Sequence, residues 1–146
     1  MIESQYYLPV ELKMGYESLE NEVLQECYNK LLATVYSIST EHDDNDRYVM
    51  PQVKMPDDEI HQKDIRLVME ALMADNPHIF WIMNAFGYAY ENGGTIVQLY
   101  SCDSSDYIQA SVNALSEATS KIIASVPGGY NEYEREKFIH NYLIDN

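Results

Sequence analysis

Basic residues are scarce in this chain. It holds 9 lysines and arginines against 24 aspartates and glutamates, which gives a formal net charge of −15 at pH 7. Binding to a nucleic-acid backbone or to an anionic membrane surface relies on clustered lysine and arginine. We therefore expect neither nucleic acid nor a membrane as a partner. The acidic excess favours solubility, and it leaves open a second interpretation, an acidic face that docks a basic partner.

Cysteine is also scarce, with Cys27 and Cys102 as the two examples. A zinc site would show Cys-x-x-Cys spacing or a surrounding cluster of histidine and cysteine, and these two cysteines show neither. Two buried free thiols are the favoured interpretation. Spacing does not decide whether a disulfide joins Cys27 to Cys102, so the redox compartment stays open.

Long apolar runs are absent. No stretch approaches about eighteen consecutive apolar residues, so we expect no transmembrane helix. The first five residues lack the basic and apolar regions of a signal peptide. We expect a cytoplasmic protein, or an extracytoplasmic or cell-surface one if the chain begins after its targeting segment.

Helical periodicity marks four segments. Leu19, Val23, Cys27 and Leu31 recur at every fourth position and predict an amphipathic first helix. Asn131 with Glu134 three residues later approximates a capping box at the start of the last. The predicted helices cover residues 17–36, 57 or 58 to 74, 105–126, and 131 onward.

Residues 79–100 have a composition typical of strands, because they are rich in aromatic and β-branched side chains. They predict strands at 80–83, 86–90 and 95–100, the last two joined by a hairpin at Asn92-Gly93. Residues 39–58 are predicted to form a loop with one short edge strand at 47–50, because Pro51 and Pro56 forbid a central strand there. The fold class is therefore α+β, an antiparallel meander of about three strands packed by about four helices.

No complete catalytic arrangement is visible. A nucleophilic thiol needs a base beside it, and its pKa is often lowered by a helix N-terminus after a Gly-rich turn. Cys27 instead lies on the apolar stripe of the first helix, and Cys102 ends the hairpin before Asp103. Neither follows a Gly-rich turn, so we predict no catalytic residue in this chain.

Metal and cofactor ligands are not indicated either. His42, His61, His78 and His140 show no helical i, i+4 pairing or His-Glu-x-x-His pattern. The loop at His42 could hold a divalent cation through its oxygens, but it lacks the glycine and terminal glutamate of a calcium-binding loop. A solvated acidic loop is favoured. That loop consists of His42, Asp43, Asp44, Asn45 and Asp46.

Paired carboxylates and alternating aromatics have plain explanations as well. The carboxylate pairs are Asp57/Asp58, Asp103/Asp106 and Glu132/Glu134. Acid–base catalysis requires a pair that is shielded from solvent, and the sequence marks none of these pairs as shielded. Phe86, Tyr88 and Tyr90 could form a stacking platform, but no basic residue lies between positions 79 and 102. A core-facing or partner-facing sheet is favoured.

Two segments together resemble a known family. Asp75-Asn76-Pro77-His78-Ile79-Phe80-Trp81-Ile82 resembles the "DNPe-FW" signature of bacterial transglutaminase-like (cysteine protease-like) proteins. The segment 132–146, EYEREKFIHNYLIDN, resembles their "ekvkaIHdyLvdn" helix, and the opening Tyr6-Tyr7-Leu8 is also similar. In that family the catalytic cysteine follows this helix in a Gly-x-Cys-type turn, with a histidine and an aspartate further on.

The resemblance implies a non-catalytic N-terminal accessory domain at 1–130, followed at 131–146 by the first helix of a core that lies beyond this sequence. The core would perform acyl transfer or peptide hydrolysis by Cys-His-Asp. Its partners would be that downstream domain and protein or cell-wall peptide substrates, and the exposed last helix could form a dimer. His140 matches a structural helix histidine, and no family catalytic residue transfers to this chain. The alternative is a stand-alone acidic, Tyr-rich binding module, such as an immunity or inhibitor protein.

Overall fold

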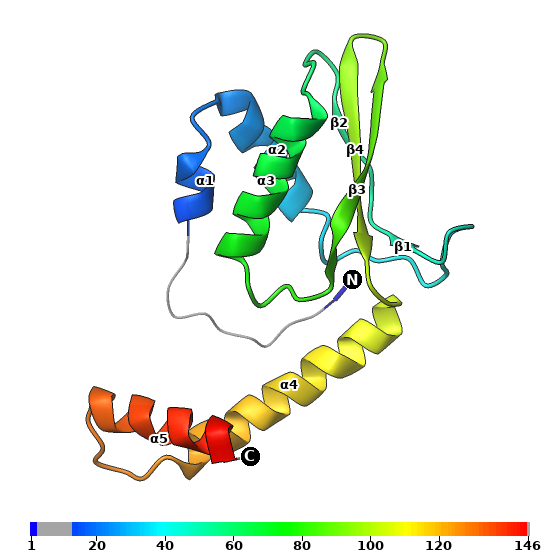
Figure 1. Cartoon of the computed structure of the whole chain (residues 1–146). Coiled ribbons are helices and arrows are strands. Elements are labelled where there is room, and N and C mark those ends of the chain that lie inside the picture. Colours follow the sequence, from blue (N-terminus) through cyan, green and yellow to red (C-terminus); the bar gives the residue numbers. More distant parts are fainter. Residues whose placement is uncertain (3–12, 146) are drawn as a thin grey trace. The chain divides into compact units, whose positions relative to one another are not determined.

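The computed structural model describes residues 1–2 and 13–145 of the chain (Figure 1). The fold divides into two compact units, Met1–Gln109 and Ala110–Asn146, which we call the body and the arm. The predicted boundary at 130/131 differs from this division, which falls inside a helix. The expectation that 131–146 leads into a further domain stays a prediction.

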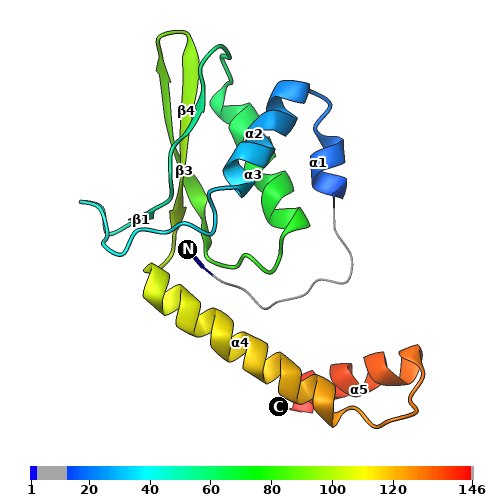
Figure 2. The ribbon, with the colours of Figure 1, turned by 180° about the vertical axis from the view of Figure 1, so that it is seen from behind.

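The body packs helices on one face of an antiparallel sheet, which confirms the α+β class (Figures 1 and 2). Buried leucine, valine and isoleucine side chains from both layers form its core. Its helices are α1 (Met14–Ser18), α2 (Glu22–Leu32) and α3 (Gln62–Asp75), and its strands are β1 (Tyr48–Val49), β2 (Val53–Met55), β3 (Ile82–Glu91) and β4 (Gly94–Ser101).

Strand β4 lies at the centre of the sheet. It pairs with β3 on one side and with β1 and β2 on the other, always antiparallel. The expected edge strand at 47–50 is β1, and a second edge strand that was not expected, β2, follows Pro51 and ends just before Pro56. The prediction that this segment forms no central strand is confirmed, because both pieces lie at the edge.

The hairpin between β3 and β4 is the predicted one. Asn92 (φ 53°) and Gly93 (φ 81°) form its two-residue turn, since both tolerate positive φ. The expected separate strands 80–83 and 86–90 were wrong in number: they are one strand, β3, whose register shifts between Ile82 and Phe86. A bulge of this kind breaks the period-2 alternation, which is why the pattern resembled two strands.

The first predicted helix, 17–36, is in fact two helices. Leu19 is extended (φ −78°, ψ 98°) and buried, and Asn21 caps α2 by accepting a hydrogen bond from the Val23 N–H. The predicted caps Asp57 and Asp58 were also wrong. Thr95 Oγ1 accepts from the Ile60 N–H and donates to the Asp58 carbonyl, so this segment is held against β4 and α3 begins only at Gln62.

Helix α4 (Ser105–Ser125) runs from the body into the arm, and α5 (Glu132–Asp145) completes it. The capping box is confirmed: Asn131 N–H donates to Glu134 Oε2 at 3.0 Å, and Glu134 N–H donates to Asn131 Oδ1 at 2.9 Å. The expected inner stripe of α4 is only partly buried, because Ile108 is covered while Leu115 is exposed. Helix α5 has no buried residue.

Candidate functional site

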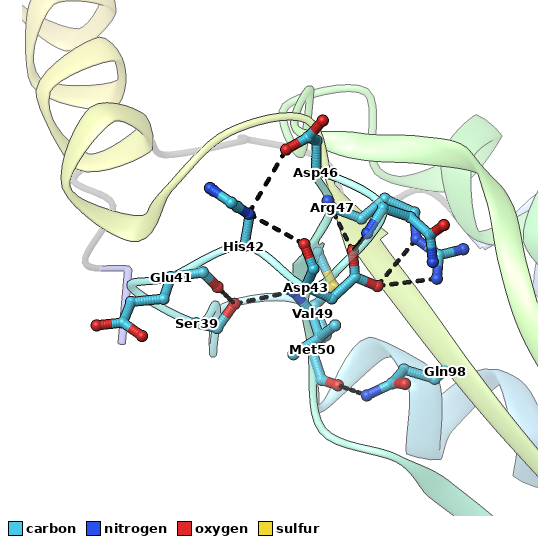
Figure 3. Close-up of polar contacts among 10 residues, drawn as sticks. Ser39, Glu41, His42, Asp43, Asp46, Arg47, Val49, Met50 and Gln98 are labelled. Carbon is cyan, nitrogen blue, oxygen red and sulfur yellow. Dashed lines mark hydrogen bonds and ion pairs between the residues drawn. The ribbon is translucent and has the colours of Figure 1, made fainter.

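The segment between α2 and β1 holds a set of polar contacts that are drawn in Figure 3. Ser39 fastens its start: its N–H donates to the Val49 carbonyl at 2.9 Å, and its Oγ accepts from the Val49 N–H at 2.9 Å. The same hydroxyl donates to the Glu41 carbonyl at 2.8 Å. The Ser39 side chain thus links the start of the loop both to Glu41 within the loop and to Val49 of β1.

Asp43 and Arg47 hold the tip of this loop. One carboxylate oxygen of Asp43 accepts the Arg47 N–H, and the other accepts from Arg47 Nε at 3.0 Å and Nη2 at 2.8 Å. The guanidinium lowers the pKa of the Asp43 carboxyl, mainly through this side-chain hydrogen bond. It also lies over the Tyr100 ring, 4.1 Å from its centroid, which ties the loop to β4.

His42 lies beside this pair. Its Nδ1 is 3.0 Å from the Asp43 carbonyl and 3.6 Å from Asp46 Oδ1. The hydrogen bond to Asp43 is the main cause that raises the pKa of His42. Over residues 1–2 and 13–145 no group of three or more His, Cys, Asp or Glu side chains is arranged to hold a metal ion. Asp43, the best-placed carboxylate, is engaged by Arg47 instead.

A hollow of about 430 Å³ lies next to the loop. Gln98 contributes to its wall but directs its Nε2 to the Met50 carbonyl at 2.8 Å. The described residues of its lining carry no titratable side chain, so they could hold a ligand by shape and backbone groups but offer no side chain for acid–base chemistry. The lining residues are Met1, Ser37, Ile38, Ser39, Val49, Met50, Pro51 and Gln98.

The two cysteines are free and differ in exposure. Cys27 is fully buried, as expected, and burial raises its thiol pKa to about 11. Cys102 is exposed, so the expectation of two buried thiols was wrong for it. It follows the end of β4, where its N–H donates to the Trp81 carbonyl. Burial and then the Asp103 charge raise its pKa, opposite to the shift that activates a thiol.

The remaining histidines occupy separate places. His61 holds the N-cap position of α3, and His140 lies exposed on α5. His78 Nε2 is 3.3 Å from the Tyr36 hydroxyl, while its buried Nδ1 has no hydrogen-bond partner. Burial lowers the pKa of His78. Among the hydrogen bonds and ion pairs of the described residues, none joins a histidine to a thiol.

One member of each of two carboxylate pairs, and two of the three alternating aromatics, make structural contacts in the described part of the chain. Asp103 Oδ1 accepts the Ser104 N–H before α4, and Glu134 completes its capping box. Tyr88 donates its hydroxyl to the Ile60 carbonyl at 2.9 Å, and Arg66 of α3 lies over the Phe86 ring. This side of β3 therefore faces the helices at Phe86 and Tyr88, which are half-buried, whereas Tyr90 is exposed. The expectation of a core-facing or partner-facing sheet stays a prediction.

Asp75 opens the segment that resembles the family signature, but the sequence patterns did not reveal its contacts with α1 and α2. It is buried at the end of α3, where its two oxygens accept from the Gly15 N–H at 2.7 Å, the Tyr16 N–H at 2.8 Å and the Tyr28 hydroxyl at 3.0 Å. Asn76 Nδ2 donates to the same Tyr28 hydroxyl. Three donors compensate one buried carboxylate, so Asp75 fastens α1 and α2 to α3.

Trp81 anchors the other end of the same segment. Its ring is almost fully buried, and its Nε1 donates to the Val35 carbonyl at 2.7 Å, just beyond α2. Tyr36 and Phe80 pack edge-on against it. A buried indole needs an acceptor for its N–H, and the end of α2 supplies one.

Comparison with known proteins gives no further guide, because no family model, no curated protein and no solved structure matches this chain. Across the described residues, no helix combines the length and apolarity needed to cross a membrane. The arrangement of charge, thiols and buried polar groups is therefore the basis for any functional conclusion.

Proposed function

We propose that this chain is a non-catalytic accessory domain of a transglutaminase-like protein, which supports a Cys-His-Asp core encoded beyond residue 146. The observation that carries this proposal is the segment Asp75–Trp81, which belongs to one of the two segments that together give the resemblance. Both of its ends are engaged in the core, Asp75 with α1 and α2 and Trp81 with the end of α2. A signature used in this way describes a scaffold and not a reacting group.

The thiols support the same view. Acyl transfer by cysteine needs a thiolate, and both thiol pKa values are raised, that of Cys27 to about 11. The start of α5 is also stabilised by its own capping box, while the apolar side chains near its end stay exposed. The proposal assigns these side chains to the contact with the core. They are Tyr142, Leu143 and Ile144.

The test is to sequence the gene beyond the codon for Asn146 and then to assay the longer protein and the present chain for activity. We expect a Gly-x-Cys turn within some tens of codons, followed by a histidine and an aspartate. The longer protein should show transamidase or peptidase activity that is lost when that cysteine is replaced, while Cys27→Ala and Cys102→Ala leave it active. A stop codon directly after Asn146 would refute the proposal, as would activity of the present chain that depends on Cys102.

A second function is favoured by the distribution of charge. Residues 1–109 hold 19 acidic and 6 basic side chains, whereas residues 110–146 hold 5 and 3. The body is therefore the acidic part, and an acidic body accelerates and orients association with a basic protein. A stand-alone binding module of the immunity or inhibitor kind would use this surface. The test is to look for a basic protein that binds the isolated chain in a salt-dependent way. Absence of such binding would refute this second function.

A further inference from the structure

The two edges of the sheet are treated differently. At the β1–β2 edge, Ser39 pairs with Val49, Lys30 Nζ donates to the Lys54 carbonyl, and prolines stand beside both strands. Coverage by a loop, lysine and proline are common means by which proteins protect an exposed strand. This edge is therefore closed to an additional strand.

The β3 edge lacks these protections. Strand β3 has ten residues, contains neither proline nor lysine, and carries a single charge, Glu91, at its last position. It pairs with β4 and with no other described strand. The register shift between Ile82 and Phe86 distorts its first part, which leaves a regular ladder from Phe86 to Glu91.

A regular edge offers backbone hydrogen bonds to an incoming strand. Alternate residues of β3 direct both N–H and C=O away from β4, and no hydrogen bond from another described residue reaches them. Gly87 and Ala89 pair with Gln98 and Ile96 on the face opposite Phe86 and Tyr88. The Tyr100 hydroxyl covers this face at Gly87, where a Cβ would lie 2.6 Å from it, so an added strand would meet β3 through its backbone edge.

The negative charge of the body favours a basic added strand over an acidic one. Three acidic residues, 57–59, lie near the hairpin end of β3, because Asp58 and Ile60 accept hydrogen bonds from Thr95 and Tyr88. One basic side chain, Arg66, lies over the Phe86 ring at the other end of the ladder. The body as a whole carries 19 acidic against 6 basic side chains. Lysine and arginine on an added strand would be attracted, whereas a second copy of the body would be repelled.

We propose that the Phe86–Tyr90 edge of β3 binds an extended, basic polypeptide segment as an added antiparallel or parallel strand. The backbone of β3 supplies the hydrogen bonds, and the acidic body supplies the preference for basic side chains. This inference is independent of the accessory role proposed above, since it depends on the sheet edge and the charge alone.

The test uses three synthetic ten-residue peptides with the full chain. One alternates lysine and valine, the second alternates glutamate and valine, and the third is the lysine–valine peptide N-methylated at every second residue. Backbone amide shifts and amide exchange are followed by NMR. We expect the first peptide to bind saturably and to slow exchange at alternate amides of 86–90. Each of the other two should bind at least about tenfold more weakly, because one lacks charge attraction and the other lacks strand hydrogen bonds.

Two chain variants locate the charge effect. Asp57→Asn, Asp58→Asn and Glu59→Gln together remove acids near the edge. Glu17→Gln, Glu20→Gln and Glu22→Gln remove the same number from α1, the start of α2 and the link between them. We expect the first variant to weaken lysine–valine binding several-fold more than the second. Equal binding of the N-methylated peptide would overturn the proposal, as would protected amides elsewhere, equal losses in the two variants, or a peptide-free dimer paired through β3.

Discussion

The body and the arm are stabilised in different ways. In the body, distant segments meet in buried polar contacts: Asp75 holds α1 from 60 residues away, and Trp81 reaches Val35 across 46. In the arm the contacts are local, such as the Asn131–Glu134 capping box and the Glu117–Lys121 ion pair one helical turn apart. The body also carries most of the acidic excess.

This difference has consequences for stability. Long-range contacts in a buried interior make the elements of the body depend on one another, so that a single substitution there should destabilise all of them. Contacts between neighbours along a helix stabilise that helix alone. The body should therefore unfold as a unit, whereas the end of the arm should open locally and at lower free energy.

The largest effect is expected from Trp81→Ala. It removes a buried ring and leaves the Val35 carbonyl without its donor, so the free energy of unfolding of the body should fall by about 3–5 kcal/mol. Urea unfolding followed by far-UV circular dichroism measures the loss. Amide exchange within α5 should not change.

Phe80→Ala is the matched control for this prediction. Phe80 neighbours Trp81 in sequence and packs against its ring, but 45% of its surface is exposed. Its removal should lower the free energy of unfolding by only about 1 kcal/mol. Similar losses for the two substitutions would show that the interior of the body is not organised around Trp81.

Asp75→Ala should have the next largest effect. The Gly15 N–H, the Tyr16 N–H and the Tyr28 hydroxyl would lose their acceptor, with a loss of about 3 kcal/mol. The amides of Gly15 and Tyr16 should exchange much faster in the variant. Asp75→Asn keeps one acceptor oxygen and should lose about half as much. Rapid exchange of both amides in the unchanged chain would contradict this account of α1.

The arm was largely predictable from the sequence, and the body was less so. Local signals set the ends of α4 and α5, and the predicted range 105–126 agrees with Ser105–Ser125 to one residue. The Asn92-Gly93 hairpin was predictable for the same reason. The break between α1 and α2 was not, because it depends on Asp75, which is distant in sequence.

Gly15 shows why that break escapes local patterns. A Cβ at this position would lie 2.6 Å from the Ala71 carbonyl oxygen and 2.9 Å from Asp75 Oδ1, so α1 approaches α3 as closely as it does because residue 15 is glycine. Helical periodicity carries no sign of such an approach. At the candidate loop, likewise, the acidic pattern favoured a solvated loop over a cation site but could not show that Asp43 would be engaged by Arg47.

In the arm, Asn131→Ala should have a smaller and local effect. Loss of the capping box should destabilise α5 by about 1 kcal/mol and speed amide exchange in its first turn. The urea midpoint of the body should stay unchanged. Glu132→Ala removes a first-turn acid outside the capping box and should lower the stability of α5 by only a few tenths of a kcal/mol. A shift of the body midpoint in Asn131→Ala would mean that the two units unfold together.

The smallest effect concerns pH and compares two histidines of the body. Burial lowers the pKa of His78 below its ordinary value of 6.5, so as pH falls below 6.5 the unfolded chain takes up a proton before the folded one, and stability decreases. His42 behaves in the opposite way. Its raised pKa gives a contribution that is complete below 6.5 and is lost as pH rises through the folded value.

An NMR titration of the imidazole shifts checks both directions. The midpoint of His78 should lie below 6.5 and that of His42 above it, and His78→Gln should flatten the acid side of the pH–stability curve. His42→Gln should leave the slope of that side unchanged, because the contribution of His42 is already complete below 6.5 and varies only at higher pH. If His78 instead titrated at or above 6.5, its buried Nδ1 would have to be reached by water, and the interior of the body would be more open at this end than its contacts with Tyr36 indicate.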